Sequence, residues 1–148
     1  MKILIVEDDS YKFTQICALV KSTIPTAEIT HFDSVHGVVR YLRKEIPDKL
    51  ILDMALPTHP PVAGEGSPVS MSSGGVEVLL ELRRLQINDL PIAILTQYPD
   101  FEIEDDYYEL VDAPDALFRH YGLKNIVSVY YEHGDTEWVL PIENFLNN

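Results

Sequence analysis

Short apolar runs alternate with amphipathic helical patterns along most of this chain, and that alternation restricts the fold more than any other feature. A short β-branched run is typical of a buried strand, whereas apolar residues three or four positions apart indicate a helix that faces a core. Alternating strands and helices predict right-handed βαβ units, and therefore a parallel sheet with helices on both faces. The expected strands lie at residues 2–6, 27–32, 50–54, 91–95 and 126–131.

The C-terminal third departs from this alternation. A helix through Leu117 is expected to end at Gly122, because glycine readily adopts the left-handed conformation that closes a helix. Residues 133–135 (His-Gly-Asp) are typical of a hairpin turn, and residues 138–142 would then return as an antiparallel strand. Only residues 144–148 remain, which are too few for a packed helix. We therefore expect an extra C-terminal antiparallel strand in place of a last helix.

Residues 58–74 interrupt the pattern inside what we expect to be a single domain at 1–148. The segment is rich in proline, glycine and serine, and it has no apolar period. Loops of this length in compact domains are usually functional or disordered. We expect a long, flexible insertion loop here.

Charge and composition exclude several classes of protein. The chain has 24 acidic and 11 basic residues and a formal net charge of −13, whereas a nucleic-acid-binding protein usually presents a basic face. No apolar run is long enough to span a membrane, and the N-terminus does not have a signal-peptide pattern. The one cysteine, Cys17, cannot form an intramolecular disulfide and fits a reducing compartment. We expect a cytoplasmic protein without direct nucleic-acid or membrane contact.

Two acidic clusters each close an expected buried strand. Glu7, Asp8 and Asp9 follow the first strand, and Asp53 ends the third. Desolvating a carboxylate is costly, so a carboxylate at such a place usually binds a cation or performs chemistry. Neighbouring parallel strands would bring the two clusters to one crevice, where open α/β sheets bind ligands. The pattern predicts a Mg²⁺ site with Asp53 as nucleophile, while Asp9 is assigned to capping the first helix.

These residues resemble the receiver domain of bacterial two-component response regulators. Residues 3–9 are similar to the family's first strand and acidic pair, and residues 47–57 to its third strand, phosphoacceptor aspartate and Leu-Pro turn. Gly75 with its leucine-rich pattern, and then residues 90–96, are similar to the third helix and fourth strand. The resemblance implies a flavodoxin-like three-layer α/β/α fold with a five-stranded parallel sheet in the order 2-1-3-4-5.

The resemblance also implies a role for each site residue. Asp53 would accept a phosphoryl group. Glu7, Asp8 and Asp53, together with the backbone carbonyl of Ala55, would hold Mg²⁺. Thr96 would hydrogen-bond a phosphoryl oxygen once Asp53 is modified.

One part of the receiver pattern is missing. Receivers carry a lysine at the end of the fifth strand, which reaches the phosphoryl group. Alignment through residues 126–131 places Val129 at that position, and alignment through residues 138–142 places Leu140 there. Two unit charges about 4 Å apart are worth up to ~4 kcal/mol at an effective dielectric of about 20, before desolvation. Gln97 also replaces the small residue that commonly follows the threonine, and its amide is placed to crowd the site or bond to it.

Two main functions fit this incomplete pattern. The first is a stand-alone atypical receiver that accepts a phosphoryl group from a histidine kinase or phosphotransfer protein and acts through an unknown protein output partner. Such a protein is no enzyme beyond self-phosphorylation and autodephosphorylation. The second is a phosphorylation-independent pseudo-receiver, an interaction module that dimerises through the terminal hairpin. A metal-dependent hydrolase is weakest, because the sequence shows no second acid–base residue.

Overall fold

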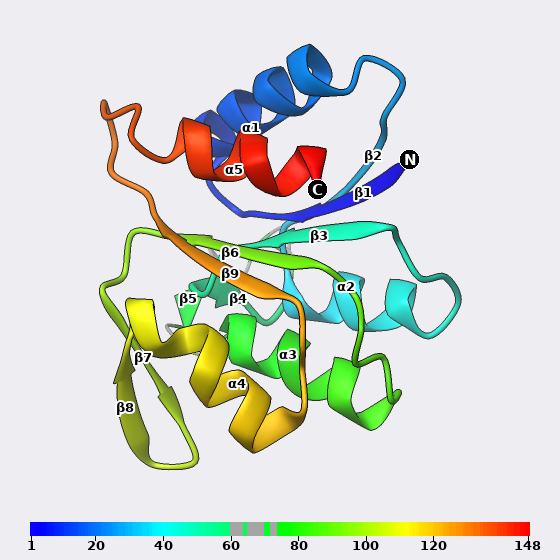
Figure 1. Ribbon diagram of the computed structural model, residues 1–148. Helices are drawn as coiled ribbons and strands as arrows, with labels where there is room; N and C mark the ends of the chain where they lie inside the picture. The colour runs from blue at the N-terminus through cyan, green and yellow to red at the C-terminus, as the bar shows by residue number, and fades with distance from the viewer. Residues whose placement is uncertain (60–63, 65–69, 72–73) are drawn as a thin grey trace.

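Five parallel strands form a central sheet in the computed structural model, which describes residues 1–59, 64, 70–71 and 74–148. Figure 1 shows the sheet between two layers of helices. Its order, β2-β1-β3-β6-β9, confirms the predicted order 2-1-3-4-5 and the flavodoxin-like architecture. The strands are β1 (Lys2–Val6), β2 (Glu28–Phe32), β3 (Lys49–Leu52), β6 (Ile92–Thr96) and β9 (Ile126–Tyr130).

Helices cover both faces of the sheet (Figure 1). On one face lie α1 (Ser10–Thr23) and α5 (Val139–Asn147); on the other lie α2 (Val35–Leu42), α3 (Gly74–Arg84) and α4 (Ala113–Tyr121). Each layer has its own apolar core, because alternate side chains of a strand point to opposite faces. In β1, for example, Ile3 and Ile5 pack on the α1 side, whereas Leu4 and Val6 pack on the α3 side.

The helix ends follow the signals in the sequence. Asp9 caps α1, where its side chain accepts a hydrogen bond from the backbone N–H of Lys12 at 3.0 Å. Gly122 closes α4 with a φ of 71°, a conformation that glycine adopts without the steric penalty of a Cβ. The Asp9 cap lets α1 begin at Ser10, a few residues after β1 ends at Val6.

Two short antiparallel pairs form small sheets separate from the central one. The strands β4 (Leu56–Pro57) and β5 (Ser70–Met71) pair across the start and end of the expected loop at 58–74. Most of that loop lies outside the described residues, so its predicted flexibility stays a prediction. The second pair, β7 (Asp100–Ile103) and β8 (Asp106–Glu109), is a hairpin that is not among the strands expected from the sequence.

The predicted C-terminal antiparallel strand is wrong. Residues 138–142 enter α5, which runs from Val139 to Asn147, after a turn at Gly134. The buried residues Trp138, Ile142, Phe145 and Leu146 have helical spacing, and Pro141 lies in the first turn, where a helix tolerates proline. A terminal hairpin, and the dimer surface expected on it, therefore do not exist.

Among the helices within the described ranges, none combines the length and apolarity needed to cross a membrane.

Candidate functional site

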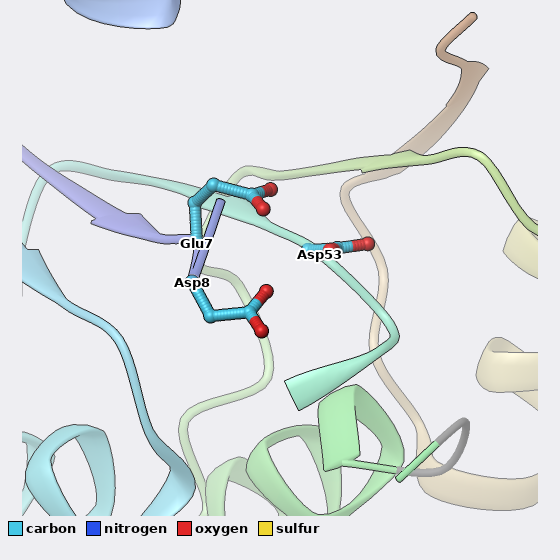
Figure 2. Close-up of side chains that lie close together, drawn as sticks. All are labelled: Glu7, Asp8 and Asp53. Atoms are coloured by element: carbon cyan, nitrogen blue, oxygen red, sulfur yellow. The ribbon is translucent and has the colours of Figure 1, made fainter. Parts of the chain in front are cut away.

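Three carboxylates meet at the carboxyl edge of the sheet. Glu7 and Asp8 follow β1, and Asp53 follows β3, which pairs directly with β1 in parallel. One oxygen atom from each of the three groups lies within 4.8 Å of the others. Figure 2 shows Glu7 and Asp8 extending toward Asp53. Glu7 and Asp53 are buried, whereas Asp8 is exposed, so the cluster lies at the mouth of a crevice.

The cluster lines a cleft of about 230 Å³. A larger cleft of about 510 Å³ lies beside the β7–β8 hairpin, but it has only Asp100 and Glu109 as charged lining residues. The smaller cleft brings together more groups that can do chemistry, so we place the site there. Its lining residues are Glu7, Asp8, Asp9, Lys12, Asp53, Ala55, Gln97, Tyr98, Tyr131 and His133.

Asp53 is held by the loop that follows β3. The backbone N–H of Met54 donates to Asp53 Oδ1 at 2.8 Å, and that of Ala55 approaches the same oxygen at 3.5 Å. Burial raises the pKa of Asp53, while the Lys12 ammonium and a hydrogen bond from the Thr96 side chain act in the opposite direction. The carboxylate is therefore fixed in place and poorly solvated, which favours binding of a cation or covalent modification.

Glu7 has a similar environment. Its exposed fraction is 2%, and burial raises its pKa from 4.5 to about 8 against the attraction of Lys12. Oε1 accepts a hydrogen bond from the backbone N–H of Asp9 at 3.0 Å. Oε2 lies 2.7 Å from the Lys12 ammonium, but no donor among the described residues reaches it with hydrogen-bonding geometry.

The start of α3 supports the Asp53 loop through a close backbone contact. The N–H of Gly75 donates to the carbonyl of Met54 at 2.8 Å. A Cβ on Gly75 would lie 2.7 Å from the backbone oxygen of Asp53, closer than real contacts allow. Glycine at this position therefore lets α3 approach the loop that fixes Asp53.

Lys12 is a site residue that the sequence reasoning missed. Its side chain is 5% exposed, and its ammonium lies 3.6 Å from Asp53 Oδ1 and donates to the carbonyl of Leu95 at 2.6 Å. The ring of Tyr131, 5.0 Å from the nitrogen, lies over it. A signal was present, because Lys12 precedes the buried residues Ile16 and Val20 at intervals of four along α1.

The structure also places the other residues singled out in the sequence. Thr96 is buried at the end of β6, and Gln97 and Ala55 line the cleft. Val129 lies in β9 within the apolar core on the α1 and α5 side. Leu140 lies in α5 and is 64% exposed, so the alignment that placed it at the end of a strand is wrong. Neither residue lines the cleft.

The three carboxylates are suited to Mg²⁺. This ion prefers hard oxygen ligands and is usually bound by one or two carboxylates with several waters. The buried Glu7 Oε2, which lacks a hydrogen-bond donor within the described part of the chain, is an oxygen of this kind. A bound cation would favour the ionised forms of Glu7 and Asp53, whose pKa values burial raises.

Comparison with known proteins agrees with this architecture. No family model matches the chain. It is 44% identical over 148 residues to the Detocs response regulatory protein DtcB of Vibrio alginolyticus. This match covers 99% of each of the two chains. The fold matches the response regulatory domain of mrkE from Klebsiella pneumoniae with a TM-score of 0.63, at 17% identity over 99% of this chain and 93% of that one.

A second solved structure has the metal itself. It is the receiver domain of a sensor histidine kinase from Pseudomonas aeruginosa, with a magnesium ion coordinated in its active site cleft. Its TM-score is 0.61 at 17% identity, with 99% of this chain and 93% of that one covered. The sequence relative identifies the family, and the solved structures identify the fold. The chain therefore belongs to the response regulators and has their receiver-domain fold.

Proposed function

We propose that this receiver accepts a phosphoryl group on Asp53 in the presence of Mg²⁺ and signals through protein contacts. The observation that carries the proposal is the placement of Asp53: buried, fixed by the Met54 N–H, and within reach of two further carboxylates and of Thr96. Phosphoryl transfer depends mainly on positioning and on neutralising charge, and this arrangement provides both.

In the proposed reaction, a carboxylate oxygen of Asp53 forms a bond to the phosphorus of a phosphodonor. The bond between phosphorus and the donor's leaving group breaks, and the leaving group keeps the electron pair. Glu7, Asp8, Asp53 and the carbonyl of Ala55 would hold Mg²⁺, which supplies charge neutralisation for the phosphoryl oxygens. The Met54 N–H keeps Asp53 oriented while its second oxygen reacts.

Thr96 would couple this chemistry to the surface. Its side chain bonds to Asp53 in the unmodified protein, and the new phosphoryl oxygens would compete for that bond. Phosphorylation adds a charge of about −1.5 to −2 and three strong acceptors. Because Thr96 ends β6 and the β7–β8 hairpin begins at Asp100, a shift of Thr96 would alter the start of the hairpin.

We propose a histidine kinase or phosphotransfer protein as the phosphodonor and another protein as the output partner. The relative DtcB is named a response regulatory protein, which supports a role in response regulation. The missing fifth-strand lysine and the bulky Gln97 favoured the pseudo-receiver hypothesis, and the terminal hairpin was its expected dimer surface. The structure has a buried ammonium beside Asp53 and a helix in place of the hairpin, so we favour the phospho-accepting receiver.

The direct test is incubation with Mg²⁺ and a small phosphodonor, followed by intact-mass measurement. We expect one phosphoryl adduct that requires Mg²⁺ and disappears in Asp53→Asn. The matched control is Asp89→Asn, which removes an exposed carboxylate from the loop before β6; it should form the adduct normally. A folded wild-type protein that forms no adduct would contradict the proposal and favour the pseudo-receiver hypothesis.

A further inference from the structure

We propose that Lys12, at the start of α1, makes the cationic contact to the phosphoryl group that receivers ordinarily make from the fifth strand. The inference rests on the proposed phosphorylation of Asp53, and it adds a residue from a different element. It also predicts a competition, because the same ammonium already contacts two of the carboxylates that would hold Mg²⁺.

The ammonium of Lys12 lies within the acid site. The Lys12 ammonium lies 2.7 Å from Glu7 Oε2 and 3.6 Å from Asp53 Oδ1, so it is beside the carboxylate whose other oxygen would carry the phosphoryl group. Lys12 also lines the same cleft as Asp53. Lysine has a flexible four-carbon stem and three rotatable donors, so a short movement would bring one donor to a new phosphoryl oxygen.

The position of Lys12 in α1 is unfavourable for a lysine. Burial disfavours an ammonium, and the start of a helix carries partial positive charge that repels cations. Ile16 and Val20 occupy the next two positions of the same buried stripe. An apolar residue would therefore also fit at position 12. An ammonium held there by Glu7, Asp53 and the Leu95 carbonyl indicates a role in the acid site.

The surroundings restrict where the ammonium can go. Tyr131 lies over it at 5.0 Å and is itself fixed by a hydrogen bond from its hydroxyl to Gln15 at 2.6 Å. The Leu95 carbonyl lies on its other side as an acceptor. These contacts keep the charge close to Asp53, so it is available before a phosphoryl group arrives.

Charge counting gives an effect that separates this role from a structural one. Lys12 and Mg²⁺ both neutralise Glu7 and Asp53, so removing the ammonium should strengthen Mg²⁺ binding. The phosphoryl group, in contrast, is an anion that needs the ammonium, so the same change should weaken its binding. A residue that only stabilises the fold would weaken both or leave both unchanged.

The test compares Lys12→Met with Lys49→Met. Lys49 is the matched control, because it is also buried and also bonds to backbone carbonyls, those of Phe145 and Asn148 in and after α5. Beryllofluoride binding is measured at saturating Mg²⁺, and Mg²⁺ binding is measured alone. Trp138 fluorescence is the readout, because this single tryptophan packs against Tyr131 with ring centroids 5.6 Å apart.

We expect Lys12→Met to bind beryllofluoride about tenfold to a hundredfold more weakly, the range for a lost hydrogen bond to a charged group. It should bind Mg²⁺ several-fold more tightly, and Lys49→Met should match the wild type in both. A folded Lys12→Met protein with wild-type beryllofluoride affinity overturns the inference while phosphorylation of Asp53 stands. Wild-type protein that binds no beryllofluoride and forms no adduct overturns both.

A measurement on the unaltered protein covers the case in which Lys12→Met does not fold. Side-chain ¹⁵N spectra of lysine-labelled protein follow each ammonium directly. Beryllofluoride should shift the Lys12 signal and leave the Lys49 signal in place. If the adduct forms and the Lys12 signal does not move, the inference is wrong.

Discussion

The substitution Glu7→Gln should change how the stability of this protein depends on pH. Burial raises the pKa of Glu7 from 4.5 in the unfolded chain to about 8 in the folded one. The folded state therefore holds a proton that the unfolded state releases, and stability falls as pH rises from about 4.5 to about 8. Glutamine does not titrate, so this loss is absent from the variant.

The size of the effect follows from that shift. For the wild type without Mg²⁺, integration gives the loss in free energy of unfolding relative to a pH well below 4.5. The loss is about 1 kcal/mol at pH 5 and about 3 kcal/mol at pH 7. The stability of Glu7→Gln relative to wild type should therefore rise by about 2 kcal/mol between these two pH values. Losing the contact between Glu7 and Lys12 adds an offset, which changes the absolute difference but not its slope over this range.

Urea denaturation followed by Trp138 fluorescence, with a chelator present, measures these differences at pH 5, 6 and 7. Glu77→Gln, on an exposed position of α3, controls for the removal of one negative charge from the surface. Saturating Mg²⁺ should flatten the wild-type profile, because the cation favours the ionised carboxylates. A difference between Glu7→Gln and wild type that stays constant within about 0.5 kcal/mol from pH 5 to pH 7 would refute the reasoning.

Two further predictions concern the structural support of the site. Gly75→Ala should lower the free energy of unfolding by about 1 to 3 kcal/mol, because the new Cβ would meet backbone atoms of Asp53 and Met54 at 2.7 Å. Gly37→Ala is the control, because its new Cβ would have the movable ring of Phe32 as its nearest neighbour. Its cost should be smaller when both variants are measured by urea denaturation. Ile142→Ala should cost about 2 to 5 kcal/mol, whereas Leu140→Ala should change stability by less than about 0.5 kcal/mol; similar costs at both positions would favour a strand, in which the two side chains share a face.

The sheet could be predicted from the sequence because its central strands β1, β3 and β6 are short apolar runs bounded by polar residues or proline. Such a run leaves little choice of conformation, and the alternation with helical stripes sets the parallel order. The acid cluster followed from the same reasoning, since Glu7 and Asp53 both come directly after strands that are neighbours in the sheet.

Two elements were missed for different physical reasons. Residues 138–142 are a short apolar run after the turn-like residues 133–135, so they suggested a returning strand. The helical spacing appears only when Phe145 and Leu146 are counted with them. The β7–β8 hairpin turns through Glu104 and Asp105 with φ of 51° and 72°. Neither residue is glycine, so the usual signal of a tight turn was absent.

Lys12 was missed because its importance lies in space and not in a motif. Sequence patterns assign a charge to a fixed position on a fixed strand, and α1 is not where a receiver pattern places its lysine. Once α1 packs against the sheet, the ammonium of Lys12 lies 2.7 Å from Glu7 Oε2 and 3.6 Å from Asp53 Oδ1. Both partners lie outside its own helix. Burial of a charged residue in an apolar stripe is the pattern that deserved more weight.

The buried lysine of α1 bears on how inactive members of such families are recognised. Loss of a family residue at its usual position is commonly equated with loss of activity, and a scan for a fifth-strand lysine would class this chain as degenerate. The cleft is lined by α1 and by the loops that follow β1, β3, β6 and β9, so a charge lost on one element can be regained on another without any similarity in sequence. Degeneracy is therefore better judged from which charges reach the acidic cleft than from which alignment columns are filled.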